Sequence, residues 1–252
     1  MIEIEDLVVS FDQPVLRGVN LTVAEGTTCV LLGVSGSGKT VLLKTLVGLI
    51  RPDRGRVRID GEEVGALDAE GLRKLREKLG VLFQAGALFD SLTVFDNVAF
   101  PLRERTRKKG AQIRETVSRT LGLMGLSGVE QLYPAELSGG MRKRVALARA
   151  FVLEPHIVLY DEPTAGLDPP TTARVADLII AAKKRLTLTA LATIYDLPTA
   201  FRVADRLAML HEGRIVEEGS PAEFTRSRHP AVRAFLRHWF EREGAQAAAH
   251  GP

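Results

Sequence analysis

Hydrophobic and polar residues alternate in three segments of the N-terminal part of the chain. These segments are Ile2 to Val9, Leu21 to Val23 and Val57 to Ile59. A period of two is typical of strands that bury one face, and the turn pair Asp60-Gly61 after the third segment favours antiparallel pairing. The pattern therefore predicts an antiparallel β-subdomain at the beginning of the chain.

Continuous apolar runs further along predict strands that are buried on both faces. The runs are Cys29–Leu32, Val81–Phe83 and Ile157–Tyr160, and Leu191–Ile194, in which Thr193 stands among apolar residues, is the next predicted strand and the fourth buried run. A glycine-rich loop and a helix beginning near Lys39 follow the first run, and another helix is predicted after Pro169-Pro170. Because strands that alternate with helices form parallel sheets, we expect an α/β fold with a largely parallel sheet, followed by a hairpin over residues 206–216.

The stretch from residue 92 to residue 153 has helical periodicity instead. Its apolar positions include Ile113, Val117, Leu121 and Met124, which recur at i, i+4, i+8 and i+11 and form one face of a helix. We interpret this stretch as a helical subdomain inserted into the α/β core. A capping box over Ser220 to Glu223 predicts a short helix near the C-terminus.

The same patterns predict one domain over residues 1–240 with a short addition at its C-terminal end. The parts are an α/β core with its β-subdomain (1–84 and 155–225), a helical subdomain (85–154), a C-terminal helical extension (226–244) and a disordered tail (245–252). The extension carries an apolar stripe, Val232, Phe235, Leu236, Trp239 and Phe240. We expect this stripe to dock on the core or on another subunit.

Composition narrows the class of protein. The chain has 252 residues, of which 45% are hydrophobic and 26% are charged, and this excludes disordered and fibrous classes. The lone Cys29 cannot form an internal disulfide, which favours the cytosol. No basic leader and no run of about 18 apolar residues occurs.

The charge of the chain gives little sign of a nucleic-acid partner, because a formal charge of +3 is too small to indicate one. The basic run Arg103–Lys109 is either solvated surface or a contact patch.

A phosphate-binding motif follows the first buried run. Residues Gly33 to Thr40 fit the pattern G-x-x-x-x-G-K-[ST] between a strand and a helix. Glycines let backbone N–H groups converge on phosphate oxygens at a helix N-terminus, Lys39 would reach the β- and γ-phosphates, and Thr40 would ligate Mg²⁺. The candidate ATP-binding residues here are Gly33, Ser35, Gly36, Ser37, Gly38, Lys39, Thr40 and Val41. A glycine-serine turn without a ligand is the alternative, which the strand and helix on either side disfavour.

Two acidic residues end the third buried run. Asp161 is placed to hold Mg²⁺, and Glu162 to polarise the water that attacks the γ-phosphate. A strand that ends in two acids is by itself a weak signal. Together with the phosphate loop upstream, it predicts a site where water attacks a γ-phosphate.

The motif Leu137-Ser138-Gly139-Gly140-Met141 completes a pattern that resembles the ATP-binding-cassette (ABC) ATPases. The resemblance covers almost the whole chain and includes Gln84 and Asp168. It implies a P-loop NTPase core, ATP and Mg²⁺ as ligands, and a head-to-tail homodimer. In such a dimer Ser138, Gly139 and Gly140 of one chain would bind the ATP held by the other.

Further residues take roles through the same resemblance. Phe11 is at the position where the family stacks an aromatic ring on adenine. Gln84 is at the position of a glutamine that contacts Mg²⁺ or the attacking water, and Asp168 matches an aspartate at the dimer interface. Thr40, Gln84 and Asp161 are thus the expected Mg²⁺ ligands, and Glu162 and Gln84 the expected catalytic residues.

Tyr195 departs from the family pattern. A histidine that contacts the γ-phosphate is expected after the fourth buried run, but the chain has Tyr195-Asp196. The phenol of tyrosine donates one hydrogen bond from further out than the imidazole of histidine would, and its charge does not change near neutral pH. We expect ATP binding to persist while hydrolysis is slowed, unless Tyr195 serves in the place of the histidine as a catalytic residue.

A narrower resemblance concerns the cellular role. Val41 to Lys44 and the run from Gly80 to Glu104 are similar to the ATPase subunit of Mla-type phospholipid transporters, which serve proteins with a lipid-binding Mce domain. This implies a peripheral location at the cytoplasmic face of the inner membrane, beside integral-membrane permease subunits. Phe89, Leu92, Phe95 and Phe100 either line a permease groove or pack in the helical subdomain.

Two other functions remain open at this point. The chain could serve an ABC importer for another substrate, or it could be a nucleotide-gated binding module with little turnover. A soluble ABC protein that acts on nucleic acid is disfavoured, because the chain has one cassette and no long heptad run.

Overall fold

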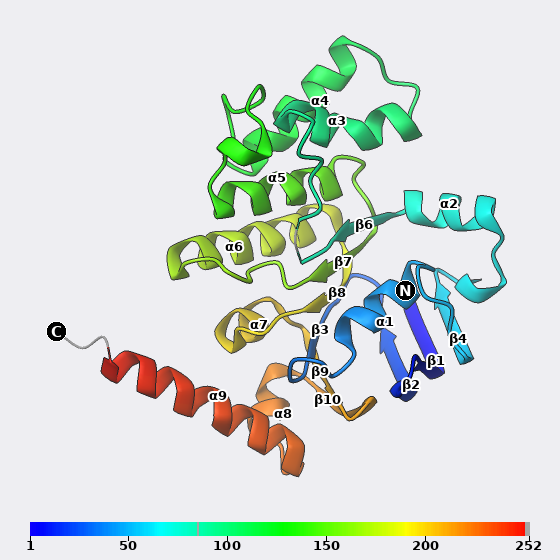
Figure 1. The fold of residues 1–252 in the computed structure, drawn as a ribbon, viewed down its shortest axis with the longest axis vertical. Coiled ribbons are helices and arrows are strands. Elements are labelled where there is room, and N and C mark those ends of the chain that lie inside the picture. Colours follow the sequence, from blue (N-terminus) through cyan, green and yellow to red (C-terminus); the bar gives the residue numbers. More distant parts are fainter. Residues whose placement is uncertain (85, 250–252) are drawn as a thin grey trace.

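Two β-sheets organise the chain, which the computed structural model describes over residues 1–84 and 86–249 (Figure 1). The four-stranded sheet has the order β2-β1-β4-β5, and the six-stranded sheet has the order β10-β9-β3-β8-β7-β6. The strands are β1 (Ile2–Ser10), β2 (Pro14–Val23), β3 (Thr28–Leu32), β4 (Arg54–Ile59), β5 (Glu62–Glu63), β6 (Leu79–Leu82), β7 (Ile157–Asp161), β8 (Thr189–Thr193), β9 (Arg206–His211) and β10 (Arg214–Gly219).

The smaller sheet is antiparallel, as the alternating pattern predicts. Ile2 is opposite Val23 on one side and Ile59 on the other. Asp60 and Gly61 both have positive φ angles, of 49° and 81°, and join β4 to β5. This is the geometry that a tight hairpin turn requires, because its backbone twist matches that of the two strands.

The larger sheet pairs β3, β6, β7, β8 and β9 in parallel and ends in the antiparallel hairpin β9–β10. The predicted buried runs coincide with its strands, but two of the expected ends shift. Phe83 lies beyond β6, because the pairing of β6 with β7 stops at Leu82 and Tyr160. Ile194 lies beyond β8, whose last partner pair is Asp161 and Thr193.

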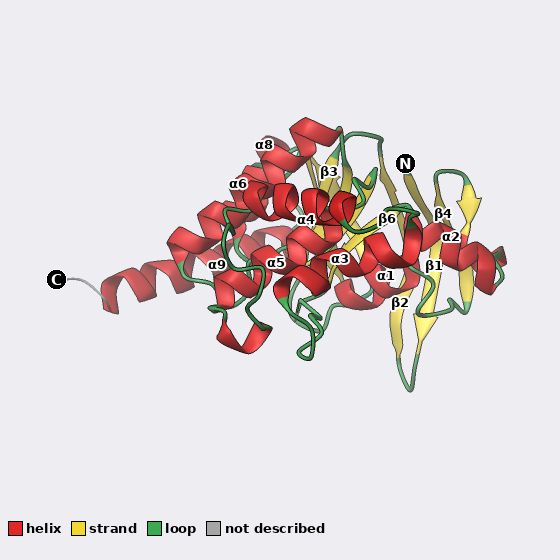
Figure 2. Cartoon of the chain, turned by 90° about the horizontal axis from the view of Figure 1, so that it is seen from above, coloured by secondary structure: helices red, strands yellow, loops and turns green. Residues whose placement is uncertain are grey.

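The helices cover the larger sheet and extend from it. They are α1 (Lys39–Leu46), α2 (Ala69–Glu77), α3 (Val94–Arg105), α4 (Ala111–Leu123), α5 (Gly139–Phe151), α6 (Pro169–Leu186), α7 (Leu197–Val203), α8 (Pro221–Thr225) and α9 (Pro230–Ala249), with 3₁₀ turns at Val64–Ala66 and Pro134–Glu136. Helices α3, α4 and α5 lie together at one end of the molecule, and the antiparallel sheet lies at the opposite side from the end of α9 (Figures 1 and 2).

Side-chain caps fix where several helices begin. Ser138, Asp168, Asp196 and Ser220 each accept a hydrogen bond from a backbone N–H group in the first turn of the helix that follows. The predicted capping box at Ser220 is present, with Glu223 bonded back to the Ser220 backbone. Such caps satisfy donors that would otherwise have no partner in the helix.

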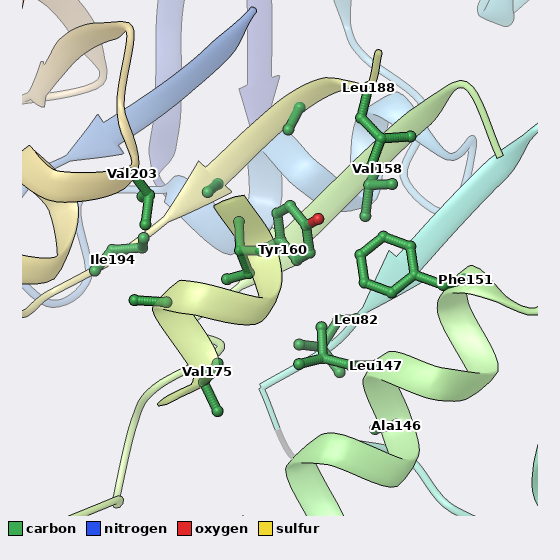
Figure 3. Close-up of a cluster of buried hydrophobic side chains, with 14 of the residues drawn as sticks. Leu82, Ala146, Leu147, Phe151, Val158, Tyr160, Val175, Leu188, Ile194 and Val203 are labelled. Atoms are coloured by element: carbon green, nitrogen blue, oxygen red, sulfur yellow. The ribbon is translucent and has the colours of Figure 1, made fainter. Parts of the chain in front are cut away.

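The larger sheet separates two hydrophobic cores. In β3, Val30 and Leu32 face one core while Cys29 and Leu31 face the other. The first core packs against helices and includes Tyr160, whose ring lies 6.3 Å from that of Phe151 and at the centre of the cluster in Figure 3. The second core lies between the two sheets. Burial on both faces explains why β3 and β7 of this sheet are continuous apolar runs apart from their ends.

The predicted apolar face of the helical subdomain is buried. Ile113, Val117, Leu121 and Met124 are at most 7% exposed and belong to the first core. Helix α3 packs against α4 and α5. The division of the chain at residues 84, 154 and 225 stays a prediction.

Helix α9 is longer than the extension expected at residues 226–244. It continues to Ala249, so residues 245–249 are helical and do not belong to a disordered tail; residues 250–252 lie outside the described residues. Val232, Phe235 and Trp239 are buried, but Phe240 is 62% exposed. Within the described ranges, no helix combines the length and apolar character that crossing a bilayer requires.

Cys29 is buried in the second core, and this predicts its reactivity. Burial, reinforced by Glu218, raises the pKa of its thiol to about 12, so the thiolate fraction at pH 8 is roughly one in 10⁴. We expect Ellman's reagent to label the folded chain negligibly and to label one thiol per chain in denaturant. Stoichiometric labelling of the folded chain at the rate of a free thiol would contradict this burial.

Candidate functional site

A cleft of about 1040 Å³ opens where β3 and β7 end and α1 begins. Its walls include Lys39 and Thr40 from α1, Asp161 and Glu162 from the end of β7, and Tyr195 from the loop after β8. The carboxyl ends of parallel strands meet at one edge of a sheet, and ligands of open α/β sheets bind there. The fold therefore brings together residues that lie far apart in the sequence.

The glycine loop has the backbone that close approach to a ligand requires. Gly36 and Gly38 have φ angles of 78° and 104°, and a Cβ atom at Gly38 would lie 2.9 Å from the Leu16 side chain. Helix α1 begins after Gly38 without a side-chain cap, so its first N–H groups point toward the loop with their partial positive charge. Among the described residues, the buried Ser37 Oγ has no hydrogen-bond partner. This arrangement fits a phosphate group.

Lys39 folds back over the loop. Its Nζ donates to the carbonyl oxygens of Gly33, at 2.8 Å, and Val34, at 3.1 Å. Burial lowers the pKa of the Lys39 ammonium, while the negative charges of Glu162 and Asp161 act in the opposite direction. A half-buried cation beside a set of N–H groups is suited to a polyphosphate.

Asp161 and Thr40 form an oxygen pair at the base of the cleft. Thr40 Oγ1 lies 3.1 Å and 3.2 Å from the two carboxylate oxygens of Asp161, which is 3% exposed. Thr193 Oγ1 donates to Asp161 Oδ1 at 2.9 Å and fixes the carboxylate. Oxygen donors of this kind suit Mg²⁺, which is commonly held by one or two carboxylates together with substrate phosphates. Thr40 and Asp161 thus fit the metal, and Gln84 lines the same cleft.

Glu162 is held from several sides. Its backbone has a positive φ of 50°, and its N–H group donates to Thr193 O at 3.0 Å and to Thr193 Oγ1 at 3.1 Å. Its Oε2 accepts a hydrogen bond of 2.9 Å from the Tyr195 backbone N–H. Burial raises the pKa of the Glu162 carboxyl, while the Tyr195 N–H and the charges of Lys39 and Lys143 lower it. A fixed carboxylate with raised basicity is suited to accept a proton from water.

The cleft gathers most of the residues that the sequence singles out, but not all. Those that line it are Phe11, Ser35, Gly36, Gly38, Lys39, Thr40, Val41, Gln84, Asp161, Glu162 and Tyr195. Gly33 and Ser37 belong to the same loop without lining the cleft. Ser138, Gly139, Gly140 and Asp168 lie outside the lining. Ser138 and Asp168 instead cap α5 and α6.

Two polar residues of the site have no motif that reveals them. Thr193 anchors both Asp161 and Glu162, and its only sequence signal is a hydroxyl within an otherwise apolar run. Lys143 donates to the carbonyl oxygens of Gln84 and Glu162 from inside α5. Nothing in its local sequence distinguishes it from the arginines on either side.

The arrangement of strand, phosphate loop and acidic strand end occurs in a known family. The sequence profile of the ABC transporter family matches residues 16–165, which run from β2 through the glycine loop to just past Glu162. The chain belongs to the ABC transporter family. It is an ATPase domain of that family, which agrees with the fold class expected from its motifs.

Two curated relatives are similar over most of the chain. The intermembrane phospholipid transport system ATP-binding protein MlaF of Escherichia coli K12 is 40% identical over 222 residues, which are 88% of this chain and 82% of the relative. The probable ribonucleotide transport ATP-binding protein mkl of Mycobacterium tuberculosis H37Rv is 45% identical over 236 residues. That match takes in 93% of this chain but only 66% of the mycobacterial protein, so the chain spans less than two thirds of this relative's length.

A solved structure agrees with the fold. It is a dimeric ATP-binding cassette in a post-hydrolysis state, bound to ADP and Pi. The TM-score is 0.83 at 30% sequence identity, and the match includes 88% of this chain and 99% of that one. The resemblance to ABC ATPases inferred from the motifs is therefore confirmed.

Proposed function

We propose that this chain is the ATPase subunit of a transporter that moves phospholipid between membranes. The observation that carries the proposal is the 40% identity to the Escherichia coli phospholipid transport protein over 82% of its length. The P-loop cleft supplies the ATP-dependent part of this function. Its working partners would be integral-membrane permease subunits and an Mce-domain lipid-binding protein, which puts the chain at the cytoplasmic face of the inner membrane as a peripheral subunit.

Two copies of the chain would complete each ATP site head to tail. The solved cassette that resembles this chain is a dimer. Ser138 and Gly139 are exposed, and with Gly140 they lie outside the cleft of their own chain. We assign these three residues and Asp168 to the nucleotide of the partner chain. Helix α5 begins at this motif, and the N-terminus of a helix attracts phosphate.

Within one chain, the cleft residues divide the work of ATP hydrolysis. Phe11 is 61% exposed at the rim, where its ring can stack on adenine. The glycine loop and Lys39 would bind phosphate, and Thr40, Gln84 and Asp161 would hold Mg²⁺, which supplies charge stabilisation at the phosphates. Glu162 would orient and activate the attacking water.

Tyr195 would make this hydrolysis slow. Tyr195 lines the cleft at the position where the family pattern has a histidine, and it is 40% exposed. We infer that its phenol does not replace the imidazole as a donor to the transferring phosphoryl group. Loss of one such preorganised donor typically lowers the rate about 10²-fold.

An exposed aromatic pair marks the surface where a permease would dock. Phe89 and Phe100 are 43% and 40% exposed, their ring centroids lie 5.0 Å apart, and they line a groove of about 460 Å³. Buried Asn97 bonds both backbone groups of Phe89 and fixes this loop. Leu92 and Phe95 do not line the groove, and Phe95 packs against the first core. We therefore assign permease docking to Phe89 and Phe100.

Substitution in this groove tests the proposal. In the complex purified with its permease, Phe89→Asp should lower ATP-dependent transfer of a fluorescent phospholipid between liposomes by at least about 10-fold, because a charge replaces apolar contact at an interface anchor. The isolated variant should still bind ATP. Leu123→Asp is the matched control, since Leu123 is 49% exposed on α4 outside the groove. Equal transfer by both variants would contradict docking at Phe89.

Two other functions have a specific observation behind them. The name of the mycobacterial relative favours transport of ribonucleotides, and ATP-dependent uptake of ribonucleotide without lipid transfer would select that function. Tyr195 favours a nucleotide-gated binding module with little turnover. ATP-dependent dimerisation without phosphate release, even with the permease present, would select this alternative.

A further inference from the structure

Lys143 is a buried cation in the middle of α5. It is 8% exposed, although most of its buried neighbours on α5 are apolar, such as Val145 and Leu147. Transfer of a charged group out of water is unfavourable unless the group gains hydrogen bonds and opposite charges. The position of the ammonium group is therefore set by the partners it finds inside the protein.

Those partners are the backbones of two residues proposed to act in hydrolysis. Lys143 Nζ donates to the carbonyl oxygen of Gln84 and, at 3.2 Å, to the carbonyl oxygen of Glu162. Gln84 follows β6, and Glu162 follows β7. One side chain from α5 thus joins the ends of two neighbouring strands at the edge of the cleft. The carboxylates of Asp161 and Glu162 are close enough to act on the same charge.

The backbone at Glu162 needs such support. Its φ of 50° lies in the left-handed region, which residues other than glycine adopt only when their surroundings hold them. Thr193 holds the N–H side of this residue, and Lys143 holds its carbonyl side. Between these contacts, the direction of the Glu162 side chain toward the cleft is fixed.

We propose that Lys143 is a positioning residue for ATP hydrolysis, which holds Gln84 and Glu162 in fixed positions and ties both to α5, the helix that begins at the Ser138-Gly139-Gly140 motif. The proposal rests on the proposed role of Glu162 in activating water. Ser138 caps α5, and Lys143 lies on the same helix little more than one turn later. The contact of Lys143 with the Glu162 carbonyl gives a displacement of α5, when Ser138 engages the nucleotide of a partner chain, a direct path to Glu162.

The test compares neutral and charged replacements of Lys143. Lys143→Met keeps most of the length of the side chain, one atom short of lysine, and removes its charge and donors, whereas Lys143→Arg keeps a cation. We expect Lys143→Met to lower kcat for ATP by about 10-fold to 10²-fold, since small displacements of catalytic groups have effects of this size. The Kd for a fluorescent ATP analogue should stay within about twofold, because phosphate contacts come from the glycine loop. Lys143→Arg should recover most of kcat.

The matched control is Arg144→Met on the same helix. The Arg144 guanidinium donates to the carbonyl oxygens of Met124 and Gly125, away from the cleft. Its loss removes a charge and two backbone contacts, so the Tm should fall while kcat per folded chain stays unchanged. If Lys143→Met behaves like this control, Lys143 has a structural role only and the proposal is overturned.

The outcome also separates this proposal from the role of Glu162. If Glu162→Gln hydrolyses ATP at the rate of the unaltered chain, neither the catalytic role of Glu162 nor the positioning role of Lys143 holds. Loss of hydrolysis by Glu162→Gln with an unchanged kcat in Lys143→Met would overturn the positioning role alone. If Lys143→Met does not fold, the same comparison is made between Lys143→Gln and Lys143→Arg, and an equal kcat in these two variants overturns the proposal.

Discussion

Phosphate release by the Glu162→Gln variant is expected to fall by roughly 10²- to 10⁴-fold, the usual contribution of a positioned general base. The amide has the size of the carboxylate and can still accept the hydrogen bond from the Tyr195 N–H. It cannot accept a proton from water at neutral pH. The fold and the glycine loop are untouched, so ATP binding should persist and the ATP-bound dimer should accumulate.

Phosphate release and size-exclusion chromatography with ATP and Mg²⁺ measure the two effects of Glu162→Gln together. Glu154→Gln is the matched control, because Glu154 is exposed and pairs with Arg119 at 3.6 Å outside the cleft. The control should release phosphate at the rate of the unaltered chain. A Glu162→Gln rate equal to that of the control would show that Glu162 is not the base.

The Tyr195→His variant is expected to release phosphate about 10²-fold faster than the unaltered chain. Imidazole offers the transferring phosphoryl group an N–H donor on a shorter side chain than that of tyrosine, and its charge can change near neutral pH. The Tyr195 N–H that holds Glu162 belongs to the backbone, so the substitution leaves this contact in place. The gain should appear in kcat, with little change in the Kd for ATP.

The residual phosphate release of Glu162→Gln is the background against which the unaltered chain and Tyr195→His are compared. Tyr133→His is the control, since Tyr133 is 46% exposed and lies outside the cleft. If the unaltered chain already releases phosphate well above that background and Tyr195→His is no faster, the phenol acts in the place of the histidine. The expectation of slow hydrolysis would then be wrong.

Local signals in the sequence sufficed for the elements that carry the phosphate loop. The alternation from Ile2 to Val9 and the apolar run Cys29–Leu32 match strands, and α1 begins at Lys39 as expected. Such features depend on neighbours a few positions away, because strand periodicity, helix starts and glycine turns are set by the local backbone. The capping box at Ser220 is present for the same reason.

These local signals do not predict contacts between elements that lie far apart in the sequence. Asp161 lies beside Thr193, 32 positions further on, because β8 pairs with β7 in the sheet. Lys143 meets the carbonyl of Gln84 across 59 positions for a similar reason, since α5 packs against β6. Helix α9 also continues to Ala249, beyond the end at residue 244 that the sequence predicts. Composition alone predicts a disordered tail for a terminal segment of alanines and polar residues.

The sequence by itself indicated the class of chemistry, since Gly33 to Thr40 and Asp161-Glu162 are short motifs whose expected roles depend on their own backbone and side chains. The tertiary structure decided how these residues are held. The strand order places β8 between β3 and β7, which sets Thr193 against Asp161 and the Tyr195 N–H against Glu162. It also leaves Ser138 outside the cleft of its own chain. Pairing across a sheet depends on the whole topology, and no local pattern encodes it.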